Sequence, residues 1–110
     1  MNFALRLLRI KVHRSAKIDL LEGKLFYDDK QLGLGDYFES SLESDIESLK
    51  LYAGIHPKHR GFYKALSERF PYSIYYRIVD GVIRIYAVLD NRADPENNQN
   101  RLDAADDLNP

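Results

Sequence analysis

The chain has 110 residues, of which 45% are hydrophobic and 30% are charged, and its formal net charge is −1. This composition is that of one ordinary globular domain, and it excludes both a disordered chain and two independent hydrophobic cores. Cysteine is absent, which excludes disulfides, thiolate metal sites and cysteine nucleophiles, and favours a reducing, cytoplasmic location.

The first patterned segment runs from Leu5 to His13. Ile10 and Val12 alternate there with charged residues, which predicts a strand with one buried face. The charges within this stretch also make it unlike a secretory signal peptide. No apolar run in the chain approaches the roughly 18 residues that span a membrane, so we expect no membrane partner.

Two helices are predicted next, and they are joined by a short loop that contains Gly33 and Gly35. Apolar residues at helical spacing predict the first helix over residues 16–30. The hydroxyl of Ser15 is expected to cap it by accepting a hydrogen bond from an amide of the first turn. Two amphipathic helices with a short connection form an αα-hairpin.

The second helix is predicted from a continuous apolar stripe with acidic residues on its other face. The members of the stripe are Phe38, Leu42, Ile46, Leu49 and Ala53. The helix is expected to begin with a capping box formed by Asp36 and Glu39, or about one turn earlier at Leu34. Gly54 and then Pro57 follow in the order that ends a helix.

Three strands are predicted after a basic loop, a short one at residues 62–67 and two longer ones at 72–79 and 82–89. Asp80 and Gly81 separate the two long strands and are typical of a tight type I′ hairpin turn. The order is therefore β-α-α-β-β-β. We expect an α+β fold in which both helices pack on one face of a three-stranded antiparallel meander.

The end of the chain differs in composition from the rest. Residues 1–89 carry a formal charge of +3 and residues 90–110 carry −4. We expect residues 1–96 to form the single domain and residues 97–110 to form a polar, acidic and mobile tail. The mildly basic domain gives weak support for a nucleic-acid partner.

The hairpin turn also predicts which side chains face one another. It places Arg77 opposite Arg84 and Tyr75 opposite Tyr86 on the sheet face away from the helices. The face beneath the helices is expected to carry Tyr72, Ile74, Tyr76, Ile78, Ile83, Ile85, Ala87 and Leu89. The arginine and tyrosine face fits two hypotheses: a solvated surface with arginine stems over the rings, or a binding surface for an acidic partner.

Metal and cofactor sites are not predicted. His56 and His59 are three residues apart, but Lys58 and Arg60 beside them oppose a divalent cation, and no third ligand lies near. A loop that binds a phosphate through several glycines and follows a strand is also missing. We therefore expect neither a metal ion nor a cofactor.

Several stretches match a known toxin family in their order and spacing. They are Leu32-Gly33-Leu34-Gly35 with Phe38, Arg69-Phe70-Pro71-Tyr72-Ser73-Ile74-Tyr75-Tyr76-Arg77, Asp80-Gly81-Val82-Ile83-Arg84-Ile85-Tyr86-Ala87-Val88, and then Arg92, Asp94 and Pro95. Through them the chain resembles, from about Val12 to Arg101, the RelE/ParE superfamily toxins of bacterial type II toxin–antitoxin systems. The likeness is to the ParE-like branch, which includes plasmid stabilisation proteins.

The resemblance implies a cytoplasmic toxin that a cognate antitoxin holds inactive. ParE-like members poison DNA gyrase through contacts and not through catalysis. The residues expected to bind a partner are Tyr75, Arg77, Arg84, Tyr86 and Arg92. This hypothesis leaves the chain without enzymatic activity of its own.

A second hypothesis is a RelE-like, ribosome-dependent endoribonuclease that cuts messenger RNA. Its catalytic set would comprise Lys64, Arg77, Arg84 and Arg92, which would stabilise the charge of the phosphate during transesterification. Ser73 and Asn98 stand where such enzymes have an arginine and a tyrosine. With two expected groups replaced, the resemblance favours the gyrase-directed role.

A third hypothesis is a non-toxic member that only binds an antitoxin. Asp90, Ala93 and Asn98 stand where ParE-like members commonly have a histidine, an arginine and a tryptophan. Each replacement removes positive charge or contact area after the last strand. The sequence leaves this hypothesis open beside the other two.

Overall fold

The computed structural model describes residues 8–106. The elements are β1 (Arg9–Val12), α1 (Arg14–Lys30), α2 (Leu34–Tyr52), β2 (Lys58–His59), β3 (Phe62–Leu66), β4 (Tyr72–Val79), β5 (Val82–Asp90) and α3 (Pro95–Asp106). The five strands form one sheet in the order β1-β5-β4-β3-β2. β1 is parallel to β5 and the other neighbours are antiparallel. The predicted α+β class and its strand–hairpin–meander order are confirmed, with β2 and α3 added.

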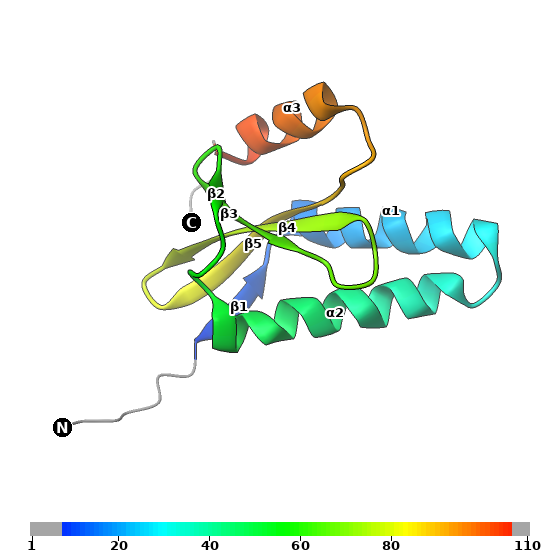
Figure 1. Ribbon diagram of the computed structural model, residues 1–110, viewed down its shortest axis with the longest axis horizontal. Helices are drawn as coiled ribbons and strands as arrows, with labels where there is room; N and C mark the ends of the chain where they lie inside the picture. The colour runs from blue at the N-terminus through cyan, green and yellow to red at the C-terminus, as the bar shows by residue number, and fades with distance from the viewer. Residues whose placement is uncertain (1–7, 107–110) are drawn as a thin grey trace.

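The helices form layers on both faces of the sheet. Figure 1 shows α1 and α2 side by side on one face and α3 on the opposite face. The predicted stripe of α2 packs into the larger core against apolar residues of β4 and β5. The buried residues of this layer include Phe38, Leu42, Ile46, Leu49, Ile74, Tyr76, Ile83 and Ile85. No helix within residues 8–106 is long and apolar enough to cross a membrane.

The first helix is capped differently from the prediction. α1 begins at Arg14, and His13 is its N-cap residue without a side-chain capping bond. The hydroxyl of Ser15 instead donates to the backbone oxygen of Tyr86 at 2.7 Å. The predicted Ser15 cap is therefore wrong, because Ser15 lies inside the first turn and its hydroxyl is used to join α1 to the sheet.

The second helix begins at Leu34, the earlier of the two predicted starts. Its first amides are capped from the preceding helix, because Asp28 Oδ1 accepts hydrogen bonds from the backbone N–H groups of Gly33 and Gly35 at 3.0 and 3.2 Å. The expected capping box that starts at Asp36 does not form, since Asp36 already lies in the first turn. The predicted C-terminal end before Gly54 is confirmed.

The pairing of β4 with β5 is confirmed near the turn and shifted beyond it. The four pairs nearest Asp80 and Gly81, including Arg77 with Arg84, have the predicted register. A bulge then leaves Tyr75 opposite Ala87, and not opposite Tyr86. Every later pair is displaced by one residue, so Val88 joins the larger core while Ala87 and Leu89 lie on the other face. The prediction that Ala87 and Leu89 lie beneath the helical hairpin is therefore wrong.

Polar groups of α1 hold this bulge in place. The Ser15 hydroxyl binds the carbonyl of Tyr86, and Asp19 Oδ2 accepts the N–H of Val88 at 3.0 Å. Both backbone groups lie at the bulge, where the regular ladder is interrupted. The bulge therefore depends on residues about seventy positions earlier in the chain.

The prediction of a mobile tail is also wrong for residues 97–106. Residues 95–106 form α3, whose buried Leu102 and Ala105 pack on the sheet face opposite the hairpin. Arg101 fastens the helix, because its two terminal nitrogens donate to the carboxylate of Asp19 at 2.6 and 2.9 Å. Residues 107–110 of the expected tail, and residues 5–7 of the expected first strand, lie outside the described residues.

The segment after α2 is joined to the core by a buried tyrosine. The Tyr76 hydroxyl accepts the N–H of Gly54 at 2.9 Å and lies 2.5 Å from Nδ1 of His56. One hydrogen bond therefore joins the Tyr76 hydroxyl to the His56 ring. Burial lowers the pKa of His56 below its ordinary value of 6.5. Burial, followed by the charges of Lys11 and Arg84, also lowers the pKa of His13.

These two histidines predict that acid weakens the fold. Their pKa values are lower in the folded chain, so the unfolded chain takes up protons first as the pH falls through 6.5. The stabilisation present above that pH is therefore lost below it. We expect the free energy of unfolding in urea to fall between about pH 7.5 and about pH 5.5, and to fall less steeply in His56→Gln. An equal slope in the variant would contradict the role of His56.

Candidate partner-binding groove

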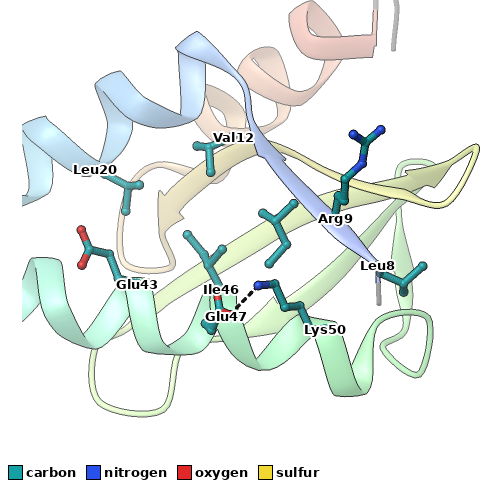
Figure 2. Close-up of a pocket in the computed structure, with 9 residues that line it drawn as sticks. Leu8, Arg9, Val12, Leu20, Glu43, Ile46, Glu47 and Lys50 are labelled. Atoms are coloured by element: carbon teal, nitrogen blue, oxygen red, sulfur yellow. Dashed lines mark ion pairs between the residues drawn. The ribbon is translucent and has the colours of Figure 1, made fainter. Parts of the chain in front are cut away.

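A large hollow on the described surface lies between β1 and the helical hairpin. It has a volume of about 680 Å³ and is lined by Leu8, Arg9, Ile10, Val12, Leu20, Glu43, Ile46, Glu47 and Lys50. Figure 2 shows Val12, Leu20 and Ile46 turned into the space between β1 and the helices. We call this feature the β1–α2 groove. Its floor is apolar, and its charged residues lie along its rim.

The rim of the groove carries both signs of charge. Glu43, Glu47 and Lys50 come from successive turns of α2, and Lys50 Nζ lies 2.6 Å from a carboxylate oxygen of Glu47. Arg9 comes from the strand, and in Figure 2 its guanidinium points away from the groove. The lining contains no histidine, serine or cysteine that could act as a nucleophile or a base near neutral pH. The groove therefore combines an apolar floor with a rim of mixed charge.

The strand beside the groove has a free edge. β1 is the last strand of the sheet on this side, and no strand within residues 8–106 pairs with its outer edge. His13 N donates to Ile85 O at 2.9 Å, so the alternate backbone groups of Ile10 and Val12 point to the outer edge. An added strand could pair with these groups and place every second side chain into the groove.

Two of the predicted partner-binding residues are not available at the surface. Tyr75 and Tyr86 are 3% and 0% exposed, because α3 covers them together with Leu89. The expected exposed arginine and tyrosine face is thus wrong for both tyrosines. Arg77 pairs with Asp106 of α3, and its guanidinium carbon lies 4.0 Å from the ring centre of Phe62.

Arg92 lies on the other side of the sheet from α3. Its side chain donates to both carboxylate oxygens of Asp90 at 3.1 and 3.0 Å and to the hydroxyl of Tyr27 at 3.0 Å. Burial alone would raise the pKa of Asp90, but the hydrogen bonds and charge of Arg92 outweigh it and lower the pKa. Arg92 is thereby held by its own chain and is not placed with Arg77 or Arg84.

The four residues of the nuclease hypothesis do not converge. Lys64, Arg77 and Arg84 line three different hollows, and Arg92 is held by Asp90 and Tyr27. The two replaced positions have structural contacts instead: the buried Ser73 donates to Asn91 Oδ1 at 2.6 Å, and Asn98 donates to the Asp90 carbonyl at 2.9 Å. Arg77 and Arg84 are paired neighbours across β4 and β5, and the bonds of Arg92 to Asp90 and Tyr27 keep it from joining them.

The groove was not predicted from the sequence. The alternation of Ile10 and Val12 did signal a strand with one buried face, which the structure confirms for residues 9–12. Its place at the sheet edge depends on parallel pairing with β5, more than seventy residues later. The free edge beside an apolar hollow therefore follows from the sheet topology, and no pattern of neighbouring residues in the sequence indicates it.

The fold is that of a known toxin–antitoxin structure. The described chain is similar to a chain of the chromosomal ParDE toxin–antitoxin system from P. aeruginosa, with a TM-score of 0.68 and 18% sequence identity. The similarity covers 76% of this chain and 95% of that one. No protein-family model matches the sequence, and no curated protein matches it. The chain thus shares the fold of a ParDE component at low sequence identity.

Proposed function

We propose that the chain is a ParE-like toxin of a type II toxin–antitoxin system and that a cognate antitoxin neutralises it in the cytoplasm. The observation that carries this proposal is the fold likeness to a ParDE component over 95% of that component's length. The order and spacing of the hairpin and strand motifs resemble the same family and support it independently of the overall shape.

The β1–α2 groove is the proposed antitoxin site. An extended antitoxin segment pairs with the outer edge of β1, and its alternate apolar side chains enter the groove over Leu20 and Ile46. The free edge supplies main-chain hydrogen bonds, while the apolar floor selects the side chains. The mixed charges of the rim favour a segment with polar residues at the positions that face outward.

The proposed target is DNA gyrase, bound through surface contacts. Binding of Arg92 by Asp90 and Tyr27, together with the structural contacts of Ser73 and Asn98, disfavours the alternative of a ribosome-dependent messenger RNA endoribonuclease. The replaced residues after β5 keep the non-toxic alternative as an outcome of the experiment. In that alternative the chain binds the antitoxin and has no target.

Induction of the chain alone in bacteria tests this function. We expect growth to stop and chromosomal DNA breaks to accumulate, and we expect co-expression of the antitoxin encoded beside the gene to restore growth. Messages cut in the ribosomal A site would contradict the gyrase target and support the endoribonuclease. Normal growth with retained antitoxin binding would contradict toxicity and leave the binding role alone.

The groove itself is tested by a matched pair of substitutions on α1. Leu20 lines the groove, whereas Leu25 lies outside it and is 61% exposed. We expect Leu20→Asp to weaken binding of the antitoxin by about tenfold or more, and Leu25→Asp to change it by less than about twofold. Calorimetric titration measures both, and circular dichroism melts confirm that each variant is folded. Equal affinities for the two variants would place the antitoxin elsewhere.

A further inference from the structure

Three basic side chains form a row on the sheet face opposite the β1–α2 groove. The parallel register sets Lys11 of β1 beside Arg84 of β5, and the hairpin register sets Arg84 beside Arg77 of β4. Residues paired in this way project from the same face of the sheet. We call these three residues the cationic row. Like charges directly across a pair destabilise a sheet unless a counter-charge lies nearby.

The described part of the chain supplies one counter-charge to this row. Asp106 at the end of α3 pairs with Arg77. Within residues 8–106 no salt bridge joins a carboxylate to Lys11 or to Arg84. A hollow of about 340 Å³ adjoins these two residues, and Arg9 lines it as well. Arg9, Lys11 and Arg84 thus line one hollow, and no carboxylate of the described residues forms a salt bridge with any of the three.

Polar atoms without partners gather at the same place. Arg84 Nε, His13 Nε2 and the Tyr86 hydroxyl are buried and have no hydrogen-bond partner among the described residues. His13 and Tyr86 stack with their ring centres 4.3 Å apart, and Tyr86 is two residues from Arg84 on β5. No other buried side-chain nitrogen or oxygen in residues 8–106 lacks a partner. Of these three residues Arg84 lines the hollow, so a ligand with acceptor oxygens bound there would lie beside its unpaired guanidinium nitrogen, which is costly to leave unpaired.

We propose that Lys11 and Arg84 of the cationic row, together with Arg9, bind a phosphate group. A phosphate fits better than a carboxylate, because its tetrahedrally arranged oxygens can accept from a guanidinium and an ammonium on different sides together. The phosphate is either free or part of a polynucleotide backbone. Base stacking is not part of the site, since the Tyr86 ring is fully buried. Lys11 and Arg84 lie on the sheet face opposite the β1–α2 groove, whereas Arg9 lines both hollows at the edge formed by β1.

Asp106 has a defined place in this proposal. Its carboxylate already neutralises Arg77, the end of the row nearest α3. It also adds negative charge beside the phosphate site. We therefore expect Asp106→Asn to tighten phosphate binding by about twofold or more, because it removes repulsion and frees the third cation.

Titration with potassium phosphate tests the site in the full-length protein. Amide chemical shifts of Lys11, His13 and Arg84 are expected to change and saturate, and potassium chloride at the same ionic strength is expected not to reproduce the change. The variant Lys11→Gln/Arg84→Gln removes two charges from the row and should weaken binding about tenfold. The matched control Lys17→Gln/Arg69→Gln removes one exposed lysine and one exposed arginine elsewhere and should leave binding within about twofold.

The other measurements distinguish a free phosphate from a polynucleotide, or reject the phosphate site. A tighter affinity for an oligothymidylate of about 12 nucleotides than for phosphate identifies a polynucleotide as the source, and an equal or weaker one identifies a free phosphate. The proposal is overturned by a response that chloride reproduces, or by equal loss in both double variants. Tighter binding of an oligoglutamate than of either phosphate probe would also overturn it. If the double variant fails to fold, the affinity of Asp106→Asn decides: no gain rejects the site.

Discussion

Replacing Gly35 with alanine is expected to destabilise the fold by about 3 kcal/mol, although alanine is the better helix former. A Cβ at Gly35 would overlap the backbone oxygen of Lys24 and lie 2.9 Å from Cβ of Asp28. The close approach of α2 to α1 leaves no room for a methyl group, and the clash is with backbone that cannot rotate away. The same displacement would disturb the capping of Gly33 and Gly35 by Asp28.

Whether Gly35→Ala lowers or raises the stability of the fold shows whether packing or helix propensity dominates at this position. Propensity alone predicts that Gly35→Ala stabilises the helix by about 1 kcal/mol. Ser44→Ala on the exposed face of the same helix is the control, and we expect it to change stability by less than about 0.5 kcal/mol. Urea denaturation measures both. A variant at residue 35 as stable as the parent would show that the two helices are not packed this closely.

Removing the carboxylate of Asp19 is expected to cost about 2–3 kcal/mol of folding free energy. Asp19 is 4% exposed, and it holds three elements together through hydrogen bonds from Val88 of β5 and Arg101 of α3. In Asp19→Ala the guanidinium of Arg101 loses its partner and the amide of Val88 is left unsatisfied at the bulge. We therefore expect α3 to become loosely held as well as the whole fold to weaken.

Two measurements check the role of Asp19. Urea denaturation gives the loss of stability, with Asp29→Ala as the control because Asp29 is an exposed acidic residue of the same helix. Hydrogen exchange of the amides of α3 reports whether that helix is released before global unfolding. A loss below about 1 kcal/mol, or unchanged protection of α3, would show that the Asp19–Arg101 pair is not what fastens the two faces of the sheet.

The parts of the fold that the sequence predicts are those determined by neighbouring residues. The stripe from Phe38 to Leu49 indicates α2 because its period matches one helix face. Asp80 and Gly81 both have positive φ, as the predicted turn requires, and they set the register of the pairs beside them. In each case the signal and the structure that it specifies lie within a few residues of one another.

The parts that were missed depend on contacts between distant residues. The Ser15 hydroxyl reaches the bulge carbonyl across 71 positions, and Arg101 reaches Asp19 across 82. A segment as polar as residues 97–106 has too few apolar residues to indicate a packed helix, and only its ion pair and its two buried side chains hold it on the sheet. Local patterns contain none of this information.

The candidate site also has one part that neighbouring residues determine and one part that distant contacts determine. The register near the turn correctly placed Arg77 opposite Arg84. The bulge then separated Tyr75 from Tyr86, and α3 buried both rings. The cationic row on that face remains at least partly exposed, while the β1–α2 groove lies on the other side of the sheet.

The central claim is that an antitoxin strand pairs with the outer edge of β1, and hydrogen exchange of single amides tests it most directly. The N–H groups of Ile10 and Val12 point to the free edge, whereas that of His13 already bonds to Ile85. When the antitoxin binds, exchange at Ile10 and Val12 is expected to slow by about a hundredfold or more, with a much smaller change at His13. Unchanged exchange at Ile10 and Val12 in a complex that protects α3 instead would contradict the claim.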